Sequence, residues 1–183
     1  MSHKRSSAAS LNIDANTIWI SGGFDGYNDL SSSEFITVEG SMEGPELPMP
    51  LRAHKMVAIN NELTMIIGGR SYGSFFAETY YYNHSDEQWI DGPNMNQARY
   101  VHAAGIITDE ATEERLVVVT GGFDVNGIDT LKSTELLLDD NWSLGKLSLK
   151  VNTPYARHVN TLWYKDRTMF IFIDQMSFFL FFK

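Results

Sequence analysis

The sequence predicts an all-β protein built from repeated units of short strands. Three segments share one pattern, in which a short β-branched or aliphatic run ends in a pair of glycines. The pairs are Gly22-Gly23, Gly68-Gly69 and Gly121-Gly122. They are spaced 46 and 53 residues apart, and no apolar stretch of any length keeps the 3.6-residue period of a helix. Aromatic residues make up 13% of the chain, which also favours β-structure.

Other residues recur in phase with the glycines. A glutamate opens the apolar stretch after each pair: Glu34, Glu78 and Glu135. A tryptophan follows the second and third of these glutamates: Trp89 and Trp142. A turn then forms at Gly44-Pro45 and at Gly92-Pro93, ahead of Met49 and Met95. An arginine and a histidine open each following run: Arg52 with His54, Arg99 with His102, and Arg157 with His158.

These features predict how the units pack. The strand before each glycine pair is apolar throughout, which indicates burial on both of its faces. The glycines suit a strand end that turns sharply or lets another backbone approach closely. Four-stranded units at a period of about 50 residues, packed face to face around an axis, are typical of a β-propeller.

Two stretches resemble the repeats of the Kelch-like proteins. One runs from Gly22-Gly-Phe-Asp-Gly26 to Glu34, and the other carries Trp89, Met95 and Arg99 in the order found in that family. The resemblance covers residues 16–171. It implies a partial Kelch-type β-propeller of four-stranded blades, with about three to four blades in an open arc.

The expected division of the chain follows from these repeats. A disordered N-terminal tail is expected over 1–15, with Lys4 and Arg5 solvated and no innermost strand before Asn16. The expected repeats are a partial one at 16–49, full ones at 50–98 and 99–153, and a partial one at 154–171. An apolar tail outside the family pattern is expected over 172–183, too short to span a bilayer. Uncovered end blades would expose apolar faces, so self-association is also expected.

Charge and composition exclude several classes of function. The net charge of −9 and the absence of any basic run argue against nucleic-acid binding. The chain has no cysteine, which excludes disulfides, thiolate metal sites and cysteine nucleophiles. No secretory signal precedes the repeats, so a cytoplasmic location is expected, although sequons at Asn83 and Asn141 leave secretion open.

No catalytic residue, metal site or cofactor is predicted. His54, His102 and His158 are expected to line a central channel, where they recur because the packing recurs and not because they bind a metal. The glutamates of the repeat are interpreted as structural, and the tryptophans as packing between blades. The acidic stretch 108–115 is expected to be a solvated hairpin loop. An alternative remains: a fragment of a propeller enzyme acting on carbohydrate, because the 23 acidic residues would permit a carboxylate pair.

The resemblance implies a non-enzymatic scaffold that binds another protein, or a substrate-recognition fragment. Kelch-like proteins present substrates to cullin ubiquitin ligases or bind actin, and the ligase role requires BTB and BACK domains that these repeats leave no room for. The partner-binding face is expected in the loops after the glycine pairs, with Arg70 and the tyrosines as its strongest contributors. Its expected residues are Phe24, Asp25, Tyr27, Arg70, Ser71, Tyr72, Phe123, Asp124 and Asn126.

Overall fold

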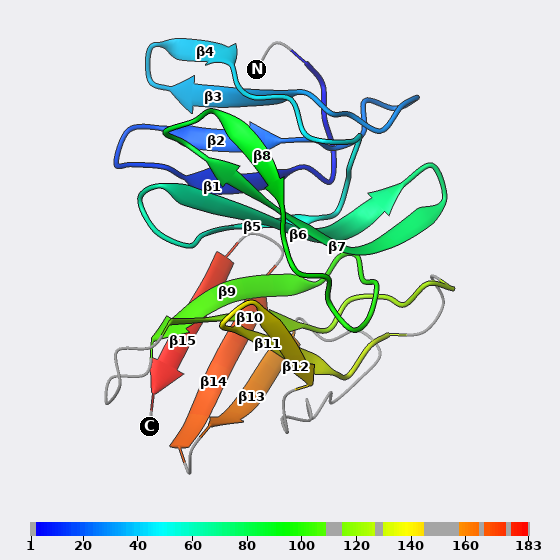
Figure 1. Ribbon diagram of the computed structural model, residues 1–183, viewed down its shortest axis with the longest axis vertical. Helices are drawn as coiled ribbons and strands as arrows, with labels where there is room; N and C mark the ends of the chain where they lie inside the picture. Colours follow the sequence, from blue (N-terminus) through cyan, green and yellow to red (C-terminus); the bar gives the residue numbers. More distant parts are fainter. Residues whose placement is uncertain are drawn as a thin grey trace.

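The computed structural model describes residues 3–108, 115–126 and 130–144, and the strands at 158–164, 167–174 and 177–182. Within this part of the chain every regular element is a β-strand, which confirms the all-β prediction. The strands form three antiparallel four-stranded sheets and one three-stranded sheet, each a simple meander in chain order (Figure 1). We call them sheets I to IV.

In the described residues, fifteen strands make up the four sheets. Sheet I contains β1 (Ala9–Asn12), β2 (Ile18–Ser21), β3 (Ser33–Thr37) and β4 (Gly40–Glu43). Sheet II contains β5 (Lys55–Ala58), β6 (Leu63–Ser71), β7 (Ser74–Asn83) and β8 (Gln88–Asp91). Sheet III contains β9 (Ala103–Thr108), β10 (Arg115–Thr120), β11 (Thr134–Leu138) and β12 (Asn141–Leu144). Sheet IV contains β13 (His158–Tyr164), β14 (Arg167–Asp174) and β15 (Ser177–Phe182).

Sheets I, II and III follow one another in space as they do in the chain. Their first strands lie side by side, β1 against β5 and β5 against β9. One apolar layer, which includes Trp19 and Ile66, lies between sheets I and II. A second layer, which includes Met65 and Val119, lies between sheets II and III. Burial of these side chains is the main attraction that holds the sheets together.

The three sheets repeat one backbone register. Just before its first strand, each sheet forms an isolated bridge to the residue that follows its glycine pair: Ser6 with Phe24, Arg52 with Arg70, and Tyr100 with Phe123. The residue after the first bridge partner has a positive φ in every case: Ser7, Ala53 and Val101. Residues at the same offset from these bridges therefore occupy equivalent positions in the three sheets.

The N-terminal prediction was wrong. Residues 9–12 form β1, the first strand of sheet I, where a disordered tail and no innermost strand were expected. Ala9 is buried and Leu11 packs against the layer between sheets I and II. The strand was missed because its sequence, Ala-Ser-Leu-Asn, has weak β-propensity and only one large apolar side chain.

The alignment of the second repeat was wrong, by two residues at Glu78 and by one residue at Arg52. Thr79 pairs with Ile67 as Ser33 pairs with Ser21, so Tyr80 and not Glu78 occupies the position of Glu34. By the same register Leu51, not Arg52, is equivalent to Arg99. Matching by residue type concealed both shifts, because Glu78 and Arg52 have the residue types that the pattern expects.

Burial on both faces holds for two of the three central strands. β6 and β10 are buried along almost their whole length, as predicted. In β2 the prediction fails, because Ile18 is 42% exposed. The equivalent residues of the next sheets, Thr64 and Val117, are 1% and 5% exposed. One face of sheet I is therefore uncovered at a position where sheets II and III are covered.

The last part of the chain also differs from expectation. The segment 172–183 was expected to be an apolar tail, but β14 continues to Asp174 and β15 spans Ser177–Phe182. β15 pairs with β14 in an antiparallel ladder. The predicted loop at 108–115 and the prediction for Arg157 lie largely outside the described residues, as does the side chain of His158.

Candidate interaction surface

A buried arginine in sheet I fixes the strand end that carries the first glycine pair. The guanidinium of Arg5 donates to Glu34 at 2.7 Å, to the Gly22 carbonyl at 2.7 Å and to the Ser32 carbonyl at 3.0 Å. Its side chain is 1% exposed. The prediction of a solvated Lys4-Arg5 tail was therefore wrong for Arg5, which ties the N-terminal segment to the loop after β2.

Sheet III repeats this arrangement at the equivalent positions. Arg99 donates to Glu135 at 2.7 Å, to the Gly121 carbonyl at 2.9 Å and to the Ser133 carbonyl at 3.3 Å. Both ionic side chains are fully buried. Burial lowers the pKa of Arg99 while Glu135 opposes that change, so the arginine stays charged beside its carboxylate. In sheet II the equivalent of the arginine is the buried Leu51.

The first two glycine pairs join sheet I to sheet II and sheet II to sheet III. The N–H of Gly23 donates to the Leu51 carbonyl at 2.8 Å, and that of Gly69 donates to the Arg99 carbonyl at 2.9 Å. A Cβ on Gly68 would lie 2.7 Å from that same Arg99 carbonyl, and Gly68 has a φ of +56°. The close approach predicted at the glycines is thus an approach between neighbouring sheets.

Two tryptophans make further links between sheets. The indole N–H of Trp89 donates to the Glu46 carbonyl at 2.6 Å, and that of Trp142 donates to the Pro93 carbonyl at 2.8 Å. Each tryptophan thereby binds the Gly-Pro turn of the preceding sheet. Packing between units, as predicted, accounts for both residues.

Two buried histidines lie at the equivalent positions predicted for them. The Nε2 of His54 is 2.9 Å from the Ser21 hydroxyl, whereas neither ring nitrogen of His102 has a partner among the described residues. Burial, with a smaller effect of Lys55, lowers the pKa of His54 to about 3. Burial, followed by Arg99, holds the pKa of His102 well below its ordinary value. Across the described residues no group of three or more His, Asp or Glu is placed to hold a metal.

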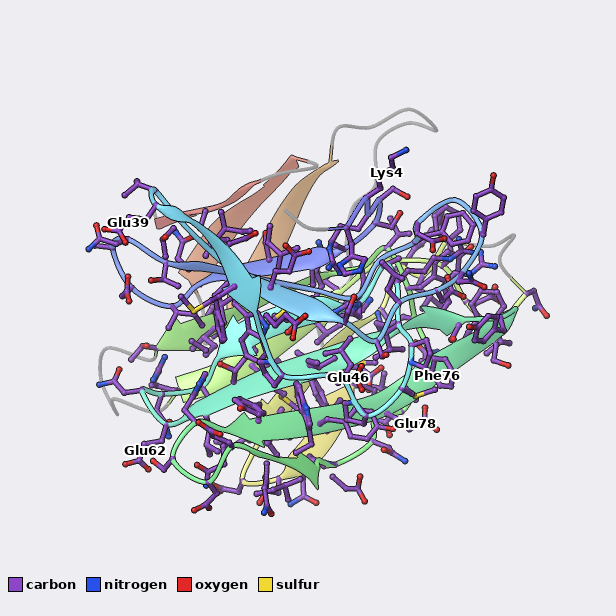
Figure 2. The ribbon with its side chains drawn as sticks, turned by 90° about the horizontal axis from the view of Figure 1, so that it is seen from above. Lys4, Glu39, Glu46, Glu62, Phe76 and Glu78 are labelled. Carbon is purple, nitrogen blue, oxygen red and sulfur yellow. The ribbon has the colours of Figure 1, made fainter. Side chains whose placement is uncertain are left out.

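The connections that follow the glycine pairs lie together at one end of sheets I to III, which we call the loop face. It comprises the connections after β2, β6 and β10 and the segments that precede β1, β5 and β9. The hairpins that contain Glu39 and Glu62 lie at the other end. Figure 2 shows Lys4 and Phe76 on one side of the molecule and Glu39 and Glu62 on the opposite side.

Arg52 and Asp29 organise the part of the loop face between sheets I and II. The Arg52 Nε lies 3.0 Å from a carboxylate oxygen of Asp29, and its guanidinium stacks 4.4 Å from the Phe24 ring centroid. The other oxygen of Asp29 accepts the N–H of Tyr72 at 2.7 Å. These contacts bring two predicted residues, Phe24 and Tyr72, onto one rigid support.

Arg70 lies at the centre of the next part of the loop face. Its guanidinium is 5.4 Å from the Phe75 ring and 5.5 Å from the Tyr100 ring. Tyr100 in turn stacks on Phe123 with ring centroids 5.4 Å apart. The aromatic series crosses from sheet II to sheet III, so it joins the predicted residues Arg70 and Phe123.

Two aspartates shape the long loops. Asp25 accepts the N–H groups of Asn28 and Tyr27 at 2.6 and 2.7 Å, and these bonds, that of Asn28 first, lower its pKa. Asp124 accepts the backbone N–H of Asn126 at 3.0 Å and its side-chain amide at 3.2 Å. Both are Asx turns, in which the carboxylate caps its own loop. Asp25, Asp124 and Asn126 therefore hold loop shape.

The predicted partner-binding residues differ in how far their side chains are exposed to solvent. Tyr27 is 91% exposed and Tyr72 is 70% exposed, and Val125 on the third loop is 57% exposed. Ser71 is buried, with no described partner for its hydroxyl, and presents no surface. Asp29, Phe75 and Tyr100 were not predicted, because they recur in no repeat pattern and gain their roles only through contacts between loops.

A shallow pocket lies on the outer strands of sheet II. Its lining includes Glu78, Tyr80 and Asp91. Burial and then the two carboxylates raise the pKa of Tyr80, so its phenol stays protonated at neutral pH. Glu78 already accepts the N–H of Ala77 at 2.9 Å.

The chain matches no protein-family model and no curated protein sequence. In the part of the chain that the structure describes, no helix has the length and apolar character needed to cross a bilayer.

Proposed function

We propose that this chain is part of a Kelch-type β-propeller whose loop face binds another protein. The observation that carries the proposal is the repeated register of sheets I, II and III, with equivalent bridges at Phe24, Arg70 and Phe123. Four-stranded meanders whose first strands lie side by side are the expected arrangement of propeller blades. In this proposal the chain is a non-enzymatic scaffold or substrate-recognition fragment.

The loop face has the composition of a protein-binding surface. Tyr27 and Tyr72 project from loops whose backbones are held by Asp25 and Asp29. Exposed tyrosines on a rigid support supply contact area at little cost in conformational entropy. Exposed aromatic side chains backed by fixed polar contacts favour binding over any role in packing within the chain.

Site-specific photocrosslinking tests the proposal. A benzophenone amino acid at Tyr27 or at Tyr72, in the full chain expressed in cells, should yield a covalent adduct with one protein partner. Val38 provides the matched control, because it is 96% exposed but lies in the β3–β4 hairpin at the other end. Equal adducts from Val38, or none from either tyrosine, would contradict the proposal.

A further inference from the structure

In the part of the chain that the structure describes, Arg70 lacks the carboxylate or carbonyl partner that four other arginine side chains have. Arg5 and Arg99 pair with Glu34 and Glu135, and Arg52 pairs with Asp29. Arg115 donates to the Ile59 carbonyl. Arg70 has no hydrogen-bond acceptor and no carboxylate among the described residues, and its Nε is buried without a partner.

The acidic side chains described on the loops around Arg70 already have other partners. The backbone of Arg70 pairs with that of Arg52, so the two arginines are neighbours on the loop face. Asp29 engages Arg52 and the N–H of Tyr72, and it forms no bond to Arg70. Asp124, an acidic residue of the next loop, accepts hydrogen bonds from Asn126. Among the described residues, no acidic side chain neutralises Arg70.

The rings of Phe75 and Tyr100 restrict the Arg70 guanidinium. The ring centroids lie 5.4 and 5.5 Å from its central carbon, within the range of cation–π attraction. The two rings also pack on each other, with centroids 4.9 Å apart. A guanidinium held in this way loses little side-chain entropy when it binds an anion, so it is preorganised for recognition.

We infer that Arg70 is the anchor for an acidic side chain of the protein partner, an aspartate or glutamate carboxylate. A guanidinium edge offers two parallel N–H donors, which match the two oxygens of a carboxylate. A phosphate dianion fits less well, since Arg52 is already neutralised and Asp25, Asp29 and Asp124 lie on the same face. This inference rests on the proposed function, and it names the chemistry that the partner must present.

Peptide titration followed by NMR of the arginine Nε–H resonances tests the inference. The probes are three capped pentapeptides of alanine with a central glutamate, glutamine or phosphoserine, added to the full chain at low ionic strength. The glutamate peptide should shift the Arg70 resonance and bind on the order of tenfold more tightly than the glutamine peptide. Arg70→Gln should abolish that difference, and Arg70→Lys should reduce it.

Arg115→Gln is the matched control. It removes one arginine charge at the first residue of β10, the end of that strand away from the loop face. It should leave the preference for the glutamate peptide intact. Equal binding of the glutamate and glutamine peptides would overturn the inference, as would binding confined to the phosphoserine peptide. Crosslinking at Tyr27 and Tyr72 has an independent outcome. If it succeeds while the peptides fail, the scaffold stands and the carboxylate anchor is wrong.

Discussion

Arg99 and Glu135 form a buried ion pair at a position of the repeat that sheet II fills without charge. Both side chains are fully buried, and Glu135 also accepts the N–H groups of Asn96 and Gln97 at 2.6 and 3.2 Å. A buried ion pair gains stability only when such additional bonds compensate the loss of hydration. Sheet II has Leu51 and Tyr80 at the equivalent positions, so the backbone arrangement does not itself require charge.

Removal of one partner of this pair should be more damaging than replacement of both. Glu135→Leu leaves Arg99 charged and buried, which should lower the free energy of unfolding by about 3–5 kcal/mol. The double variant Arg99→Leu with Glu135→Tyr, which copies sheet II, should recover more than about 1 kcal/mol of that loss. Urea unfolding measures both values. A double variant as unstable as the single one would contradict the expectation.

The buried histidines predict a loss of stability in acid. In the folded chain the pKa of His54 is about 3, and in the unfolded chain it is about 6.5. The unfolded chain therefore binds more protons between these values, and stability falls as pH falls through 6.5. From pH 7 to pH 5, each histidine that stays neutral in the folded state should cost about 2 kcal/mol.

His102→Leu separates this effect from other acid effects. His102 has no described partner, so the substitution should leave stability at pH 7 unchanged or raise it. The loss between pH 7 and pH 5 should shrink by about 2 kcal/mol relative to the unsubstituted chain. Unfolding curves at the two pH values supply the comparison. Parallel losses in the two proteins would show that His102 does not control acid stability.

At the scale of the elements, long apolar strands were predictable and short polar ones were not. β6 and β10 are continuous apolar runs that end in glycine pairs, and the structure has them where the sequence predicts them. β1 has weak propensity, and it is a strand because Arg5 binds Glu34 of β3 and Ala9 packs in the layer between sheets I and II. The shifts in sheet II, two residues at Glu78 and one at Arg52, were hidden because both match the residue types of the pattern without matching its register.

The glycine pairs allow a test of the contact between sheets. Gly68→Ala meets both a positive φ of +56° and the Arg99 carbonyl at 2.7 Å. Gly73→Ala meets a positive φ of +90° but no atom within 4 Å. Gly73→Ala should cost about 1–2 kcal/mol, the penalty of a left-handed backbone. Gly68→Ala should cost at least about twice as much, and equal costs in urea unfolding would argue against a tight approach between the sheets.

At the scale of the whole molecule, the stacking could be predicted but the interaction surface only in part. The repeat predicts that loops after the glycine pairs share one end, and the structure brings Phe24, Arg70 and Phe123 to it. The supports of that surface come from different sheets. Asp29 reaches Arg52 and Tyr72, and Tyr100 lies between Phe75 and Phe123. Contacts between loops that are distant in sequence produce no periodic pattern, so they cannot be predicted from the repeat.

The uncovered face of sheet I makes the stack asymmetric. Ile18 is exposed on a face whose counterparts in sheets II and III pack against a preceding sheet. A face shaped to meet another sheet of this repeat is suited to contact a second copy of the chain. We therefore expect concentration-dependent self-association through sheet I.

Sedimentation velocity of two matched variants tests this expectation. Ile18→Lys places a charge on the uncovered face and should shift the chain toward the monomer. Ile90→Lys adds the same charge at a residue that is 51% exposed on β8, and it should leave the association unchanged. Apolar contact explains the difference, because burial of a lysine ammonium in an interface carries a desolvation penalty that a solvated lysine avoids. Association that persists equally in both variants would place the contact on another surface, and a strictly monomeric unsubstituted chain would show that sheet I is stable uncovered.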